Sequence, residues 1–191
     1  MKRILFATVV LLLVAATFSG WWWVRGSLPA LDGQLALPGL RAPVEVLIDG
    51  YGVPAAYARD ADDAWFAAGA LHARDRLWQM ELYRRVTLGR LSEVMGEPTL
   101  PIDQRFLTLG LRQAAADEWS RATPAVRGAL ERYAAGVNAV ASTLTGRRRP
   151  IEMQILGITP APWTPEARAH ADTPRALRAG GAGETDRKSV V

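Results

Sequence analysis

The sequence of 191 residues contains no cysteine, which excludes disulfide bonds, thiolate metal sites and a cysteine nucleophile. It has two histidines, His72 and His170, which are too few for a histidine-rich metal centre. Lysine is almost absent, because Lys2 and Lys188 are the only two, so arginine carries nearly all of the positive charge. The arginines are spread along the chain and are not interleaved with stacking aromatic residues, so we expect no binding to nucleic acid.

Long polar or low-complexity tracts are also lacking over most of the chain. The composition is 49% hydrophobic and 22% charged, which is typical of a globular protein. A chain of this length predicts one domain or part of one domain.

One long hydrophobic run is present, at the N-terminus. Lys2 and Arg3 precede an uncharged run over residues 4–24, and at helical rise these 21 residues span about 30 Å, the thickness of a bilayer core. Three consecutive tryptophans, Trp21 to Trp23, resemble an interfacial aromatic belt, and no Ala-x-Ala cleavage site is present. We therefore expect residues 1–24 to form an uncleaved anchor in a bacterial inner membrane, with the main domain in the periplasm or outside. Export followed by signal cleavage is the alternative.

The next part of the chain alternates turn residues with short apolar segments. Residues 25–43 are rich in Gly, Pro and Leu and predict a spacer, and residues 44–48 predict a strand because they are β-branched and flanked by turns. The Gly-Tyr-Gly-Val-Pro segment at 50–54 predicts a turn, followed by a short extended piece at 55–58.

Three helices are predicted from caps and apolar spacing. Asp60 is placed to cap a helix over residues 61–88, a second helix begins at Asp103 and runs through Trp119, and Thr123 with Pro124 begins a third that ends at Gly146. The first predicted stripe is Ala64, Ala68, Leu71, Trp78, Leu82 and Val86, widened by Phe66, Ala70, Leu77 and Met80, and the third helix has Val126, Leu130, Tyr133, Val137, Val140 and Leu144.

Motif blocks follow one another at 50–96, 133–138 and 150–163. The first contains Gly-Val-Pro, Asp-Ala, Ala-x-Asp-Arg-Leu-x-Gln-Met-Glu, Arg-Arg and Gly-Arg-Leu, the second is Tyr-x-x-Gly-Val-Asn, and the third ends in Pro-x-Pro-Trp. In these blocks the chain resembles the penicillin acylase family of N-terminal-nucleophile amidases. One departure is that Ala55-Ala56 stands where the family commonly has His-Ile after the proline.

The resemblance assigns the motif residues to the scaffold and not to catalysis. These residues are Gly52, Val53, Pro54, Asp63, Asp75, Arg76, Gln79, Met80, Arg85, Gly89, Gly136, Asn138 and Trp163. His72 and Asp75 share a helical face and could imitate a base and its orienting acid, but the resemblance implies a structural role for both. We expect Asp75 to join Arg76 in a hydrogen-bonding network.

The resemblance further implies an α+β fold, namely the α-chain part of an αββα sandwich that is mostly helical within this segment. It implies hydrolysis of linear amide (C–N) bonds in small acylated substrates by a serine at the N-terminus of a separate β-chain, formed by autoproteolysis, with its own α-amine as base. That serine lies beyond residue 191, so no catalytic, cofactor-binding or metal-binding residue is expected in this chain. Calcium is implied for the full-length enzyme, with ligands outside this chain.

The resemblance ends near Glu166. Residues 44–166 therefore predict an incomplete α-chain portion, and residues 167–191, which have no aromatic residue, are expected to be out-of-frame or artefactual sequence. On this interpretation the 191-residue chain alone is inactive. The alternative is a membrane-anchored helical binding or adaptor protein without catalysis, against which the predicted strand and the Gly-Val-Pro turn argue.

Overall fold

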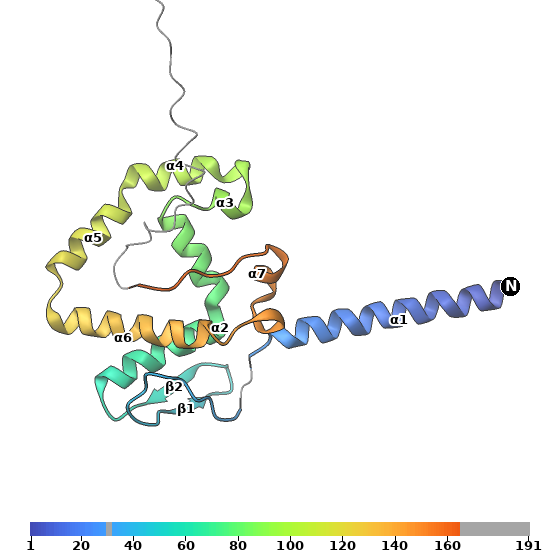
Figure 1. Ribbon diagram of the computed structural model, residues 1–191, viewed down its shortest axis with the longest axis horizontal. Coiled ribbons are helices and arrows are strands. Elements are labelled where there is room, and N and C mark those ends of the chain that lie inside the picture. The colour runs from blue at the N-terminus through green and yellow to red at the C-terminus, as the bar shows by residue number, and fades with distance from the viewer. Residues whose placement is uncertain (30–31, 165–191) are drawn as a thin grey trace, which may run out of the picture.

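The computed structural model describes residues 1–29 and 32–164, so the predictions made for residues 167–191 lie outside the described residues. A single helix, α1 (Lys2–Ser27), projects from a globular part that contains all other elements (Figure 1). Those elements are β1 (Glu45–Ile48), β2 (Pro54–Tyr57), α2 (Ala61–Thr87), α3 (Ser92–Met95), η1 (Glu97–Thr99), α4 (Leu100–Leu109), α5 (Leu111–Arg121), α6 (Pro124–Ala141), η2 (Gly146–Arg148) and α7 (Ile151–Ile155), where η marks a 3₁₀ helix.

Helix α1 has the length and composition of a membrane span. It is 26 residues long, none of its residues is buried, and its most apolar window has a mean hydropathy of 2.2. Hydrophobic side chains without protein around them need an apolar solvent, so this helix could serve as a signal sequence or as an anchor.

The two strands form an antiparallel hairpin in which Glu45 pairs with Tyr57 and Ile48 with Pro54. In the turn, the Asp49 carboxylate accepts hydrogen bonds from the N–H groups of Tyr51 and Val53, each at 2.9 Å. Both predicted extended segments are confirmed to within one residue.

Helix α2 begins where the sequence predicts. The Asp60 carboxylate accepts a hydrogen bond of 2.7 Å from the N–H of Asp63, which confirms the N-cap. The helix bends at Arg76, whose φ of −138° and ψ of 23° are not helical, and the sequence did not predict this kink.

Helices α2 and α6 cross at two glycines. A Cβ atom built on Gly69 would lie 2.0 Å from the carbonyl oxygen of Tyr133, and one built on Gly136 would lie 1.9 Å from that of Phe66. The two backbones can approach this closely only because neither position carries a side chain.

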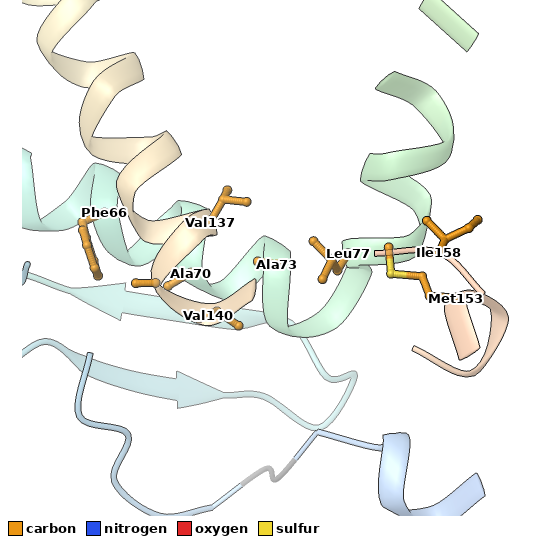
Figure 2. Packing of buried hydrophobic residues seen from close by; sticks show 9 residues of the cluster. Phe66, Ala70, Ala73, Leu77, Val137, Val140, Met153 and Ile158 are labelled. Atoms are coloured by element: carbon orange, nitrogen blue, oxygen red, sulfur yellow. The ribbon is translucent and has the colours of Figure 1, made fainter. Parts of the chain in front are cut away.

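The core lies along this crossing and extends to α7 (Figure 2). It consists of Phe66, Ala70, Ala73, Leu77, Val137, Ala139, Val140, Met153 and Ile158. The predicted centre of the α2 stripe is wrong, because Ala64 is exposed while Phe66 and Leu77 are each 1% exposed. The N-terminal half of the predicted α6 stripe is also wrong, since Val126 and Leu130 lie in solvent.

The helix predicted from Asp103 through Trp119 is in fact two helices. Gly110 has a φ of +66°, a left-handed conformation that ends α4, and α5 starts at the next residue. Glycine adopts this conformation at little cost, which is why it commonly ends helices.

Candidate functional site

Three carboxylates are buried in the described globular part. Asp63 and Glu81 are 0% exposed, and Asp103 is 4% exposed. A buried carboxylate must be neutralised or hydrogen-bonded, because burial without partners strongly disfavours the charged form. What surrounds each of these groups therefore determines whether it can act on a substrate.

Asp63 is held by the segment before the hairpin and by α6. Its carboxylate accepts hydrogen bonds from the N–H groups of Arg41 at 3.1 Å and Ala42 at 2.9 Å, and from Nη2 of Arg132 at 2.9 Å. The hydrogen bond from the Arg41 N–H and those from Ala42 and Arg132 hold the pKa of Asp63 below its usual value, against the opposing effect of burial. Arg132 also covers the ring of Phe66, with its guanidinium carbon 5.1 Å from the ring centroid.

Glu81 forms an ion-pair cluster at the other end of α2. Its carboxylate pairs with Arg84 and, at 2.8 Å, with Arg85, and Arg85 continues to Glu93 at 2.8 Å. Arg84 donates a hydrogen bond to the carbonyl of Pro162 at 3.4 Å, which connects α2 to the third motif block. Glu81 and Arg85 are four residues apart, the spacing at which helical side chains meet, but this spacing does not indicate that the carboxylate is buried.

Asp103 joins α4 to the start of α3. It accepts hydrogen bonds from the N–H groups of Leu91 at 2.7 Å and Ser92 at 2.8 Å, and from the hydroxyl of Ser92. Burial raises the pKa of Asp103, but the three hydrogen bonds outweigh it and leave the pKa below its usual value. Gly89, with a φ of +63°, brings the chain against the Asp103 backbone.

Asn138 on α6 binds the backbone of the third motif block through two hydrogen bonds. Its Nδ2 donates to the carbonyl of Trp163 and its Oδ1 accepts from the Trp163 N–H, both at 2.8 Å. The structure thus brings together Asn138 and Trp163, and it places Arg85 in the Glu81 cluster and Gly136 at the crossing with α2.

The other motif residues lie apart from these contacts. Gly52, at a φ of +80°, and Val53 lie in the hairpin turn, Pro54 begins β2, and Met80 packs against the core.

The predicted network between Asp75 and Arg76 is wrong. Asp75 accepts from Nε of its neighbour Arg74 at 2.7 Å, while Arg76, at the kink, donates to Oε1 of Gln79 at 3.1 Å. The kink turns the two neighbouring side chains to different partners.

His72 is paired with a residue of α6 and not with Asp75, the acid on its own helix. Its Nδ1 lies 2.8 Å from the hydroxyl of Tyr133 on α6, and burial raises the pKa of that hydroxyl. Helix α2 therefore presents no pairing of His72 with Asp75, and the contact serves the packing of α2 on α6.

These arrangements are structural. The oxygens of Asp63, Glu81 and Asp103 already accept from N–H, hydroxyl or guanidinium donors, so they are poor candidates for proton transfer or for coordination of a cation. Within residues 1–29 and 32–164, no group of three or more His, Asp or Glu side chains could hold a metal ion.

Sequence reasoning did not identify Arg132 or Asp103 as members of this framework. Their partners lie outside any local window, because Asp103 binds Leu91 and Ser92, 12 and 11 residues earlier, and Arg132 binds Asp63, 69 residues earlier.

Comparison with known proteins gives consistent matches. The family model for penicillin amidase matches residues 43–186. Penicillin acylase 2 proenzyme of Pseudomonas sp. (strain SE83) is 40% identical over 142 residues, which cover 74% of this chain and 18% of that protein. Acyl-homoserine lactone acylase QuiP of Pseudomonas aeruginosa is 36% identical over 140 residues, covering 73% of this chain and 16% of that protein. This chain therefore spans less than a fifth of the length of these two relatives.

A solved structure with the same fold is the thermostable penicillin G acylase from Alcaligenes faecalis. It superposes with a TM-score of 0.54 at 26% sequence identity, covering 66% of this chain and 68% of that chain.

Proposed function

This chain belongs to the penicillin amidase family, and we propose that it is the N-terminal portion of a precursor of an amidase that hydrolyses linear C–N bonds of acylated substrates. The observation that carries the proposal is the family match over residues 43–186. The substrate class follows from the relatives, which are named as penicillin acylases and acyl-homoserine lactone acylases. β-Lactam side chains and acyl-homoserine lactones are thus the substrates to test first.

In this proposal the described residues provide support for a nucleophile located elsewhere. The reaction would be carried out by a serine at the N-terminus of a β-chain released by autoproteolysis, whose α-amine accepts the hydroxyl proton. Donors outside this segment would stabilise the tetrahedral intermediate. The 191-residue chain on its own would then hydrolyse no amide, and calcium, if the full enzyme uses it, would be held by other residues.

The proposed β-chain partner is supported by the apolar side chains that the globular part leaves in solvent. Trp65 on α2 is 48% exposed, Tyr57 on β2 is 59% exposed, and Leu107 and Leu109 on α4 are about as exposed. Exposed apolar residues of this size typically mark a surface that packs against another part of the protein. We assign these surfaces to the catalytic sheets of the αββα sandwich.

We also propose that α1 is an uncleaved anchor in the inner membrane with the globular part on the periplasmic side. Its 26 residues, its exposed apolar surface and the basic residues before it support this placement. A cleaved signal sequence has the same composition, so the distinction is made by the N-terminus of the mature protein. Sequencing is expected to find Met1 or Lys2, and an N-terminus at or after Gly20 would refute the anchor.

The function is tested by completing the chain with sequence from a relative. Residues 1–164 are joined to the following segment of penicillin acylase 2 proenzyme, and self-processing and release of acyl groups from chromogenic amides are measured. We expect processing and hydrolysis in the chimera, no processing when its new N-terminal serine is changed to alanine, and no hydrolysis by the 191-residue chain. Hydrolysis by that chain alone, or a folded chimera that never processes, would contradict the proposal.

A further inference from the structure

The globular part is bound to the last turns of α1 through two tryptophans. The indole N–H of Trp23 donates a hydrogen bond of 2.7 Å to Oε1 of Gln154, and the guanidinium carbon of Arg147 lies 3.4 Å from the centroid of the Trp22 ring. Gln154 also donates from Nε2 to the carbonyls of Arg147 at 3.2 Å and Arg149 at 2.7 Å. One amide side chain therefore connects α1, η2 and α7.

This connection continues into the core. Met153, the neighbour of Gln154 on α7, is 0% exposed and belongs to the same buried cluster as Leu77 of α2. The N–H of Ile158 closes α7 by donating to the carbonyl of Met153 at 2.9 Å. Packed side chains join α1 to the core. The same face of the globular part therefore always lies next to Trp22 and Trp23.

That face is basic and apolar. Over residues 142–164 the charged residues are three consecutive arginines, Arg147 to Arg149, and one acid, Glu152. At the end of α7, Ile155 is 68% exposed and Leu156 is 40% exposed. Figure 1 shows η2 and α7 at the edge of the globular part from which α1 projects.

Basic and apolar side chains beside an aromatic belt are the combination found at the surface of anionic bilayers. Tryptophans lie at the level of the lipid headgroups, arginines are attracted to anionic phospholipids, and exposed aliphatic residues enter the boundary between headgroups and acyl chains. Arg25, in the last turn of α1 and 5.2 Å from the Trp21 ring centroid, adds a further positive charge at the same level.

We propose that residues 146–156, here termed the α7 corner, form a second membrane contact on the anionic phospholipids of the bilayer that α1 spans. This inference rests on the proposed membrane anchor and adds a fixed orientation of the globular part on the lipid surface. Arg148 contributes the exposed charge, while Ile155 and Leu156 insert between the headgroups.

The test uses the absence of cysteine from the sequence, which makes any introduced cysteine a unique labelling site. Ile155→Cys carries an environment-sensitive fluorophore, and Leu109→Cys is the matched control, because it is also an exposed aliphatic residue at the end of a helix. Figure 1 shows the junction of α4 and α5 on the side of the globular part away from α1. The full 191-residue chain is reconstituted into vesicles of zwitterionic lipid with or without phosphatidylglycerol.

We expect the label at 155 to lie about 5–10 Å within the interface and to be quenched by nitroxide lipids, while the label at 109 is quenched by aqueous iodide. Adding Arg148→Glu should raise the iodide accessibility of the label at 155 about fivefold in anionic vesicles and little in zwitterionic ones. Trp23→Phe, which removes the hydrogen bond to Gln154, should likewise raise the iodide accessibility of the label at 155, whereas Trp21→Phe should leave it unchanged.

Three results would overturn the inference in different ways. If the chain resists alkaline carbonate extraction but both labels are equally accessible to iodide, the α7 corner does not contact lipid and the anchor still stands. If carbonate releases the chain, the anchor fails and the second contact fails with it. An α7 corner that is buried equally well without anionic lipid and with Arg148→Glu would overturn the electrostatic recognition.

Discussion

Because α2 and α6 cross closely, we expect Gly→Ala to have opposite effects on stability at two glycines of α6. Gly136 and Gly128 both lie inside α6, so Gly→Ala at either position gains about 1 kcal/mol of helix propensity. A Cβ on Gly128 would meet nothing within 4 Å, whereas a Cβ on Gly136 would lie 1.9 Å from the Phe66 carbonyl oxygen and 3.0 Å from the Ala70 nitrogen. G128A should therefore be stabilising and G136A strongly destabilising.

The size of the second effect follows from the separation that the methyl group requires. Ordinary contact begins at 3.4 Å, so α6 would have to move by about 1.5 Å from a neighbour that is backbone and cannot rotate away. A gap of this size removes much of the dispersion energy between Val137, Val140 and α2, and overpacking of cores costs about 1–3 kcal/mol. Because the obstacle is backbone, the upper end of this range, about 3 kcal/mol, applies, and after subtraction of the propensity gain G136A should be less stable than wild type by about 2 kcal/mol, or about 4–8 °C in Tm.

The assay is unfolding of the full chain in detergent micelles by urea and by heat, followed by far-ultraviolet circular dichroism. G128A, with the same added methyl group in the same helix, is the control for propensity. If G136A is as stable as G128A, the helices do not approach as closely as described, and the explanation of the two glycines is refuted.

Three further predictions concern the polar framework. Because the folded pKa of Asp103 is lowered from 3.8, its charge stabilises the fold above that pH and the contribution is lost as the pH falls through the lowered value. Urea unfolding between about pH 5 and pH 3 should thus be less pH-dependent in D103N than in wild type. N138A, which loses both hydrogen bonds to Trp163, should cost about 1–3 kcal/mol and increase proteolysis near that residue. D60A should cost about 1 kcal/mol through loss of the α2 N-cap, and unchanged urea unfolding would refute the cap.

Local chemistry was enough to predict where the hairpin, α2 and α6 begin. Asp60 and Thr123 cap α2 and α6 through their own side chains, and the hairpin turn depends on a nearby aspartate and on Gly52. Such signals act within a few residues, so they can be recognised without knowledge of the fold. The division between α4 and α5 also had a local signal in Gly110, which the apolar spacing on both sides obscured.

The buried face of α2 could not be predicted from apolar spacing. The face runs from Asp63 through Phe66, Ala70 and Leu77 to Glu81, so its two ends are carboxylates, which the search for an apolar stripe rejects. Asp63 and Glu81 are 18 residues apart, and the kink at Arg76 lies between them. Their burial depends on partners that no local window contains, above all Arg132, 69 residues after Asp63.

This arrangement explains how two alanine-rich helices keep a single register. Between Phe66 and Leu77 the buried apolar side chains of α2 are those of Ala67, Ala70 and Ala73, which are alike in size and would tolerate a slip along α6. A slip would leave the buried Asp63 without Arg132 and would place a side chain where Gly69 or Gly136 meets a carbonyl. Unpaired buried charge and backbone overlap are both costly, so these few contacts select one packing from several of similar apolar burial. Asp63, Arg132 and the two glycines thus fix the geometry of the helices.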